Sequence, residues 1–566
     1  MADVTVDESS FARAAGRQLL IYGLLTLIGF TAIMFGLNVM ASFVGSDTGS
    51  SKAIDASTKS ITLALRDEPP QLDSTKATDA ISGQILGHVM EGLLRQDAQN
   101  KIQAGVAETW EITPEGATFH LRPDALWSDG KPVTAHDFVF SWRTVVDPKT
   151  ASEYAFIMYF VKNAEAINLG TLPITELGVT GLDDRTLRVE FERPLSFFEK
   201  VVAFKTFLPI REDFYKQTKG RYGADTHEML YNGPFRVTSW VHGASLKVVK
   251  SEHYWRRDEI KLNSINWAYM TSDPNATFNF FKDGKIAVAG LSADSLANAM
   301  EQRWQIKQFQ EGVVFFLEFN QRPDRLTRNL NLRKALQLVN DPSEVVNKVT
   351  KLPGYLVSDS LFPVYLDGVK DKFKVEKPPK QIVRDVAAAR RHLELAKQEL
   401  GLKEIPPLAL LSDDTPTANV MAEYYQGLFR DTLGLELRID KQIFKQRLAK
   451  MTSGEFDLVT AGWGPDYEDL LTFGDLFASW NLNNRGRYAS AEYDRQVRIV
   501  QSSMDQVERV EAFAKMQDLI IDDAVILFNY ERGASYVTHP QIKGIVRRVI
   551  GSDPDFSYAW IDEGQG

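Results

Sequence analysis

Short apolar patterns of two kinds follow one another along most of the chain. Alternating positions or short apolar runs predict strands in five segments: 61–65, 118–121, 187–191, 235–237 and 246–249. Apolar residues at helical spacing predict helices in six segments: 81–94, 135–146, 333–339, 385–400, 418–433 and 507–521. Because strands and helices interleave, the pattern predicts a mixed α/β body.

Local signals define one of these helices more closely. Thr134 stands directly before the helix expected over 135–146, and Asp137 follows three residues later, as in a capping box. The segment S-D-G-K-P at 128–132 has the composition of a turn in which Gly130 is free to take a positive φ. The aromatic residues around it are expected mostly in the core: Trp110, Phe119, Trp127, Phe138, Phe140 and Trp142.

A continuous apolar run near the N-terminus differs from both patterns. Residues 19–44 contain no ionisable side chain except Tyr22, and 26 helical residues exceed the roughly 30 Å hydrocarbon core of a bilayer. Arg13 and Arg17 precede the run and Asp47 follows it, so the positive-inside rule places the N-terminus in the cytoplasm. We expect a cytoplasmic tail over 1–18, an uncleaved transmembrane signal-anchor helix over 19–44 and a linker over 45–59. A long buried core helix is the alternative.

Composition narrows the possible functions. The 566 residues are 44% hydrophobic and 25% charged, which are globular proportions. With 65 basic and 75 acidic residues the formal charge is −10, the wrong sign for neutralising nucleic-acid phosphates, so no nucleic-acid partner is expected. The sequence has no cysteine, which excludes thiol catalysis, disulfides and cysteine-ligated metals.

Motifs of common catalytic and metal sites are missing from the sequence. It contains no G-x-S-x-G, G-x-x-x-x-G-K-[ST], G-x-G-x-x-G or H-E-x-x-H. The eight histidines are scattered, and the nearest approach to a ligand pair, His88 with Glu91, is interpreted as a surface polar pair on one helix. We therefore expect no enzyme activity, no metal and no cofactor.

One long segment and several short ones carry a family resemblance. The long segment spans 107–155 and includes F-H-L-R-P-D-A-L-W-S-D-G-K-P-V-T-A-H-D-F. The short ones are E-G-L-L at 91–94, N-G-P-F at 232–235, N-L-R-K-A-L at 331–336, A-G-W-G-P-D-Y at 461–467 and V-I-L-F-N-Y at 525–530. From about residue 61 onward the chain resembles the extracytoplasmic solute-binding proteins of peptide ABC transporters. D-P-K-T-A-S at 147–152 is most similar to their oligopeptide-binding branch.

The resemblance implies a fold as well as a function. The fold is α/β, bilobal and periplasmic-binding-protein-like, of the large type II kind with an inserted extra domain. Its implied boundaries are lobe I over 60–90, 230–312 and 531–566, the inserted domain over 91–229, and lobe II over 313–530. Strand hinges between the lobes let them close on an extended peptide.

The resemblance also implies which residues bind the ligand. Asp466 matches the family's carboxylate that pairs with a peptide's N-terminal amine, although G-P-D-Y alone is also typical of a proline-initiated turn. Asn320 either donates amide hydrogen bonds in the cleft or caps a strand end. Five aromatic residues line either the cleft or the core: Tyr154, Trp463, Tyr467, Phe528 and Tyr530.

Two positions depart from the family pattern. Some oligopeptide binders carry a basic residue directly before A-G-W and an acidic residue in the segment after the first L-D. This chain has Thr460 at the first position, and Thr78 followed by Asp79 at the second. How the C-terminus of the ligand is recognised is therefore open.

The expected function follows from these points. We expect a monomeric, membrane-anchored binding protein whose body lies outside the cytoplasm, in the periplasmic space. It captures short peptides by lobe closure and delivers them to the permease subunits of an ABC importer. Two alternatives remain: a binding protein for cell-wall peptide or another non-peptide solute, and an anchored receptor or chaperone-like interaction protein.

Overall fold

The computed structural model describes residues 52–195, 197–352 and 354–564. The expected cytoplasmic tail, the expected transmembrane helix over 19–44 and the first half of the expected linker lie outside these residues. Within the described ranges, no helix is both long enough and apolar enough to cross a membrane.

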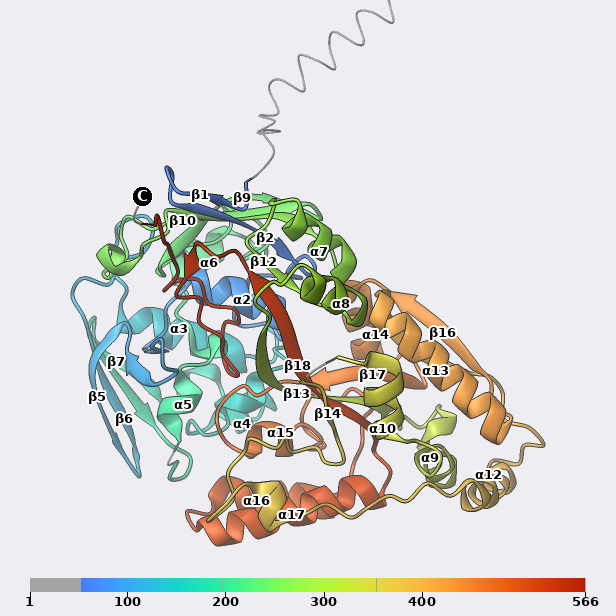
Figure 1. The fold of residues 1–566 in the computed structure, drawn as a ribbon. Helices are drawn as coiled ribbons and strands as arrows, with labels where there is room; N and C mark the ends of the chain where they lie inside the picture. The colour runs from blue at the N-terminus through green and yellow to red at the C-terminus, as the bar shows by residue number, and fades with distance from the viewer. Residues whose placement is uncertain (1–51, 196, 353, 565–566) are drawn as a thin grey trace, which may run out of the picture. The chain divides into compact units, whose positions relative to one another are not determined.

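The first strands of the described chain belong to a five-stranded sheet. Its order is β1-β2-β11-β10-β9, in which β2 runs parallel to β11 and the other neighbours are antiparallel. The bounds are β1 (Ile54–Asp55), β2 (Ser60–Leu65), β9 (Phe235–Val241), β10 (Ser245–Lys250) and β11 (Ser264–Met270). Helix α2 (Ala80–Val89) packs beside β9 (Figure 1). This sheet and helix form the centre of lobe I.

The segment between α2 and β9 forms smaller sheets with their own helices. The sheets are the pair β3 (Leu94–Gln96) and β4 (Ile102–Ala104), and the antiparallel sheet β5-β6-β8-β7, made of β5 (Ala107–Thr113), β6 (Gly116–Leu121), β8 (Thr186–Glu190) and β7 (Val179–Asp183). The helices are α3 (Ala135–Val146), α4 (Ala164–Asn168), α5 (Phe198–Val202) and α6 (Glu212–Gln217). Helix α3 contacts β7 and β8, so its apolar face is buried on this sheet.

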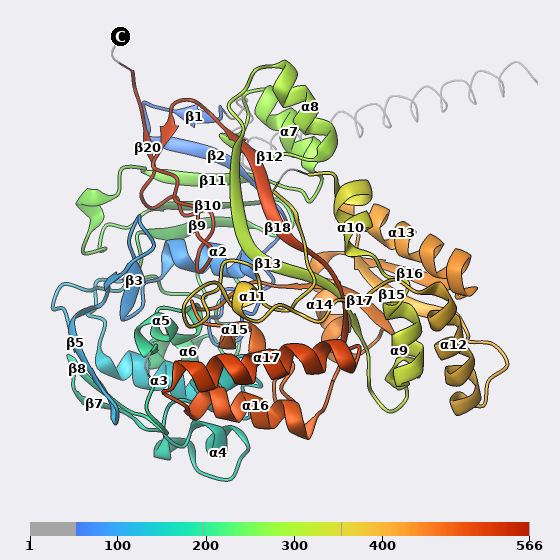
Figure 2. The same cartoon turned by 60° about the horizontal axis from the view of Figure 1, so that its bottom comes forward.

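Two long strands run from lobe I into a second, larger sheet. β13 (Lys307–Phe319) and β18 (Ile526–Thr538) pair antiparallel along almost their whole length. One end of β18 pairs with β12 (Val288–Gly290) beside β2, and the other end of β13 pairs with β17 (Leu458–Trp463). Figure 2 shows both strands passing from the side of β2 to that of β15 and β17. The expected strand hinges would lie along these two strands.

The second sheet has the order β12-β18-β13-β17-β15-β16 and is covered by helices. β15 (Leu408–Asp413) lies parallel to β16 (Leu437–Gln442) and to β17, and β14 (Leu356–Val357) pairs with β18. The remaining helices are α7 (Pro274–Lys282), α8 (Ala293–Glu301), α9 (Leu330–Gln337), α10 (Pro342–Glu344), α11 (Phe373–Glu376), α12 (Val386–Leu400), α13 (Pro416–Leu433), α14 (Phe444–Ser453), α15 (Leu471–Gly474), α16 (Ala491–Ser502) and α17 (Gln506–Asp522). Two short strands near the C-terminus, β19 (Ile542–Lys543) and β20 (Trp560–Ile561), pair with each other.

Most local predictions are confirmed. All five predicted strands form, and α3 has the bounds expected from the sequence, with the capping box of Thr134 and Asp137 in place. Gly130 has a φ of +82°, as the turn requires. Four of the six aromatic residues assigned to the core are fully buried, whereas Trp110 and Phe140 are partly exposed.

The helix expected over 81–94 was wrong in its last five residues. Helix α2 ends at Val89, and Met90 is extended with φ −126° and ψ 153°. The side chain of Asn232 accepts a hydrogen bond from the Glu91 N–H at 3.0 Å and donates one to the Glu91 carbonyl at 2.8 Å. A partner distant in sequence therefore holds this backbone out of the helix.

The interpretation of His88 and Glu91 as a surface pair was also wrong, because both side chains are buried. Glu91 accepts hydrogen bonds from the Tyr254 hydroxyl and the Trp255 indole, each at 2.6 Å. His88 donates from Nδ1 to the Gln84 carbonyl at 2.7 Å and accepts at Nε2 from the Phe556 N–H at 3.0 Å. Burial lowers the pKa of His88, so the ring is kept neutral.

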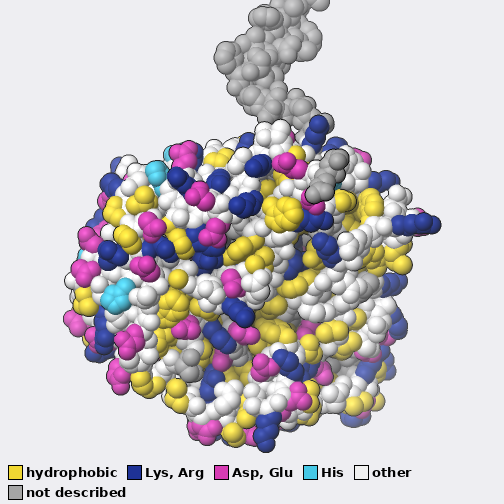
Figure 3. Space-filling view, turned by 60° about the vertical axis from the view of Figure 1, so that its left-hand side comes forward, with side chains coloured by type: hydrophobic (Ala, Val, Ile, Leu, Met, Phe, Trp, Pro, Cys, Tyr) yellow, Lys and Arg dark blue, Asp and Glu magenta, His cyan; other side chains and the backbone are white. Residues whose placement is uncertain are grey.

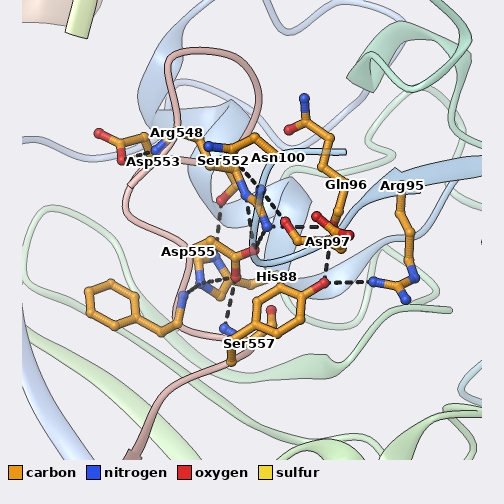
Figure 4. A network of polar contacts seen from close by, with 12 residues as sticks. His88, Arg95, Gln96, Asp97, Asn100, Arg548, Ser552, Asp553, Asp555 and Ser557 are labelled. Atoms are coloured by element: carbon orange, nitrogen blue, oxygen red, sulfur yellow. Dashed lines mark hydrogen bonds and ion pairs between the residues drawn. The ribbon is translucent and has the colours of Figure 1, made fainter. Parts of the chain in front are cut away.

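The buried histidine belongs to a polar network that attaches the C-terminal segment to lobe I (Figure 4). Arg548 donates to Asp555 at 2.7 Å, to the Asp97 carbonyl at 2.8 Å and to the Asn100 side chain at 2.6 Å. Arg548 and Asp555 are both almost fully buried. The segment between β19 and β20 is thereby fixed against α2 and the β3–β4 pair, beside the cavity described next.

Candidate ligand-binding site

A cavity of about 1050 Å³ is lined by residues from both parts of the fold. Lobe I contributes the end of β2, α2 and the segment after α5, and the larger sheet contributes β13, β17, β18 and α14. The loop that follows β17 and the C-terminal segment 547–558 also reach it. A space of this size is at the upper end for small-molecule pockets, large enough for a short peptide.

Asp466 lies in the loop after β17 and forms part of the cavity wall. Its backbone N–H donates to the Thr472 hydroxyl at 2.7 Å, and its Oδ1 accepts from the Tyr154 hydroxyl at 2.8 Å. Only 6% of the residue is exposed. Burial raises the pKa of Asp466 to about 7, against the opposing effects of the Lys205 charge and the Tyr154 hydrogen bond. A cation next to this carboxylate would favour its ionised form.

Tyr154 and Trp463 lie beside Asp466 in the same wall. Their ring centroids are 6.3 Å apart, and the Trp463 indole donates to the Thr472 carbonyl at 2.7 Å. Tyr530 also lines the cavity and stacks on Phe315 with centroids 4.9 Å apart. The structure therefore brings four of the seven expected binding residues to the cavity: Tyr154, Trp463, Asp466 and Tyr530.

The other three expected residues lie behind the cavity wall. Asn320 is fully buried and donates to the carbonyls of Gly454 and Phe456 at 3.0 and 2.7 Å, which is the strand-end arrangement. Tyr467 is buried and stacks on Phe197 from the segment before α5, with centroids 5.6 Å apart. Phe528 is buried within β18.

Sequence reasoning missed four cationic residues of the cavity wall, because none of them lies in a recognisable motif. They are Lys205, Arg66, Arg447 and Arg532. Lys205 has one sequence signal, because it is the only charged residue in V-V-A-F-K-T-F-L at 201–208. The arginines come from three elements distant in sequence, so only the fold reveals them as a group.

The three arginines share two carboxylates. Asp413 accepts from Arg447 at 2.6 Å and lies 3.5 Å from Arg66, and Arg532 pairs with Glu311. This part of the wall therefore has an excess of positive charge. Arg66 directly follows β2 whereas Asp413 ends β15, so their contact also joins the two lobes.

Further contacts join the lobes around the cavity. Glu153, which follows α3, accepts from Arg485 at 2.5 Å, and its carbonyl accepts from the Asn483 side chain at 3.1 Å. Arg485 is 5% exposed. Together with the pairs of Tyr154 with Asp466 and of Phe197 with Tyr467, these contacts hold the lobes in a closed arrangement.

Comparison with known proteins identifies the family. A model of the bacterial extracellular solute-binding proteins, family 5, matches residues 101–484. The chain belongs to this family. Its members are solute-binding proteins, and the similar proteins are binding components of ABC transporters rather than enzymes.

Three relatives show how far the similarity extends. The dipeptide-binding protein DppE of Bacillus subtilis is 28% identical over 94% of this chain and 97% of its own length. The substrate-binding domain of an oligopeptide ABC transporter from Bacillus anthracis matches with a TM-score of 0.86, 32% identity, 91% of this chain and all of its own. OppA of Listeria monocytogenes bound to peptide matches with a TM-score of 0.84, 30% identity, and 89% and 99% of the two chains.

Two structures of a more distant relative bear on the lobe arrangement. The murein tripeptide-binding protein MppA of Escherichia coli matches with a TM-score of 0.80, but a structure of MppA in its unliganded open form matches with only 0.59. Both are 24% identical to this chain. This structure therefore superposes better on the first MppA structure than on the unliganded open form.

The pair of Glu153 and Arg485 gives a test of this closed arrangement. Arg485→Ala leaves Glu153 without its ionic partner in a largely buried place, a loss of about 3 kcal/mol for a pair of this kind. We expect the ligand-free variant to have a larger radius of gyration than the unaltered protein in small-angle scattering. Arg495→Ala is the control, because Arg495 pairs with Glu492 on the exposed face of a single helix. An unchanged radius for Arg485→Ala would contradict a closing role for this pair.

Proposed function

We propose that this chain is a membrane-anchored, extracytoplasmic binding protein that captures short peptides by lobe closure and delivers them to an ABC importer. The observation that carries the proposal is the buried carboxylate of Asp466 in the wall of the cavity that both lobes line. An α-ammonium is the group that such a carboxylate is suited to bind, because pairing offsets the cost of burying the charge.

Backbone hydrogen bonds give a peptide a second means of attachment. β15 pairs with β17 only at Leu458 and Val459. Of the strands that the structure describes, none pairs with residues 461–463 on that side of β17. An extended peptide can add itself to this edge, and backbone bonds of this kind hold peptides without regard to their side chains.

The arginine group supplies the opposite charge for the other end of a peptide. Arg532 on β18 and Trp463 on β17 pair with adjacent residues of the intervening strand β13, so they are two strand spacings apart, about 10 Å. We assign the C-terminal carboxylate of the ligand to the wall formed by Arg66, Arg447 and Arg532. These residues replace the basic residue that some relatives carry at the position of Thr460.

The anchoring part of the proposal rests on residues 19–44, which lie outside the described residues. Their apolar length and the flanking charges support a single membrane-spanning helix. We expect the full-length chain to sediment with membranes and to be released by detergent but not by high salt. A chain beginning at residue 50 should instead be found in the soluble fraction. Recovery of the full-length chain in the soluble fraction would contradict the anchor.

Replacement of Asp466 tests the binding mode directly. Asp466→Asn keeps the shape but removes the charge, so we expect a loss of about 2–5 kcal/mol in the binding free energy of free tri- to pentapeptides, measured by calorimetry. N-acetylated peptides, which lack the ammonium, should bind the unaltered protein as weakly as free peptides bind Asp466→Asn. Glu468→Gln is the matched control, because Glu468 is two residues away and exposed.

The outcome also separates the proposal from its alternatives. Equal binding of free and acetylated peptides would reject the amine-pairing role and favour a ligand without a free α-amine. Binding of neither form would move the function to a non-peptide solute or a protein partner.

The raised pKa of Asp466 predicts a dependence of binding on pH. Because the pKa of Asp466 is about 7, the carboxylate becomes protonated as the pH falls below that value. A protonated carboxyl no longer attracts the ammonium, so the affinity for peptide should fall as the pH is lowered. Between pH 7.5 and 5.5 we expect a decrease of roughly twentyfold, from the fraction of ionised carboxylate alone. Asp466→Asn should bind weakly at both values. A flat profile for the unaltered protein would show that the ionised carboxylate does not bind the ligand.

A further inference from the structure

Lys205 places an amine in the part of the cavity wall that holds Asp466. Burial lowers the pKa of this amine, whereas the charges of Asp466 and Asp79 favour its protonated form. It is the first residue of the single turn Lys205–Phe207, and its side chain lies against α2, where a Cβ on Gly83 would be 3.6 Å from its Cδ and 3.9 Å from its Nζ. The ammonium lies over the ring of Phe204 at 4.2 Å and over the ring of Tyr154 at 4.9 Å. The same Tyr154 donates its hydroxyl to Asp466. Lys205 and Asp466 therefore both contact the side chain of Tyr154, one over its ring and the other at its hydroxyl.

Lys205 has no direct ionic partner in the part of the chain that the structure describes. The carboxylates of Asp466 and Asp79 act on it through space, and no hydrogen bond or ion pair joins it to either of them. Asp79 is itself engaged as the N-cap of α2, with Oδ1 accepting from the Ser82 N–H at 2.7 Å. The ammonium is thus held in place by packing and ring contacts, not by a salt bridge that would neutralise it.

A charge count shows what this end of the cavity can accept. The two carboxylates that act on the Lys205 ammonium are those of Asp79 and Asp466, and all three residues line the cavity. A third carboxyl, Asp475, is buried nearby, where burial and the charges of Asp466 and Asp469 raise its pKa well above its usual range and favour its neutral form. One further positive charge balances the group. A second one would be uncompensated in a place with little water, where like charges repel strongly.

We propose that Lys205 limits the amino end of the cavity to a single positive charge, so that the protein selects peptides whose first residue is uncharged over those that begin with Lys or Arg. This inference rests on the proposed function, because it takes Asp466 as the partner of the α-ammonium. The first side chain leaves the carbon that carries this ammonium, so a basic group on it adds a second positive charge to the part of the cavity that contains Tyr154 and Lys205. Specificity then comes from a repulsion built into the site.

The test compares two tripeptides that differ only in the charge of the first side chain. Norleucine-Ala-Ala and Lys-Ala-Ala are titrated into the full-length protein in detergent, with Lys205→Met as the variant. The unaltered protein should bind the norleucine peptide about tenfold more tightly or better, whereas Lys205→Met should reduce this ratio to about threefold or less. Lys200→Met is the matched control, because Lys200 also borders the cavity but is half exposed and paired with Glu468 at 3.2 Å. The control should keep the ratio of the unaltered protein.

Each outcome decides the inference. Equal affinities in the unaltered protein, or an unchanged ratio in Lys205→Met, would overturn it and leave peptide binding through Asp466 intact. No binding of either peptide would overturn both proposals. If Lys205→Met does not fold, Lys205→Gln replaces it. A comparison of Ala-Ala-Lys with Ala-Ala-norleucine in the unaltered protein then provides a test without any variant, because the selectivity must be confined to the first position.

Discussion

The cost of keeping the Asp466 carboxylate away from water determines how this cavity can work. A buried carboxylate is stable only when a hydrogen bond or a cation compensates for the lost hydration. Tyr154 supplies one hydrogen bond and Lys205 a through-space attraction, yet the pKa of Asp466 stays near 7. The compensation within the protein is incomplete, and in the proposed binding mode a ligand ammonium completes it. If the ligand binds as proposed, ligand binding and lobe closure are coupled through the same group, since Tyr154 belongs to one lobe and Asp466 to the other.

The long strands β13 and β18 make this coupling mechanically possible. Each belongs at one end to the sheet region beside lobe I and at the other to the sheet that carries β17 and the Asp466 loop. In a hinge motion of this kind, closure needs only small changes along two strands. The face drawn in Figure 3 shows acidic and basic side chains interspersed. The net charge of −10 is therefore not concentrated there.

Features with a local cause could be predicted from the sequence, and features made by distant partners could not. The capping box of Thr134 and the positive φ of Gly130 depend on neighbouring residues alone. The end of α2 at Val89 depends on Asn232, far along the chain, and the burial of His88 depends on Phe556. Asp466 could be identified from the sequence because the motif around it, at 461–467, is similar to a motif of the family. Lys205 and the arginine group could not, because only the fold brings them to the cavity.

A crystal structure of the protein with trialanine tests the central claim most directly. The account predicts the peptide in an extended conformation, with its ammonium about 3 Å from a carboxylate oxygen of Asp466 and its C-terminus toward Arg66, Arg447 and Arg532. The Tyr154 hydroxyl should keep its bond to the same carboxylate. A peptide bound in the reverse direction, or with its ammonium paired to another group, would contradict the account.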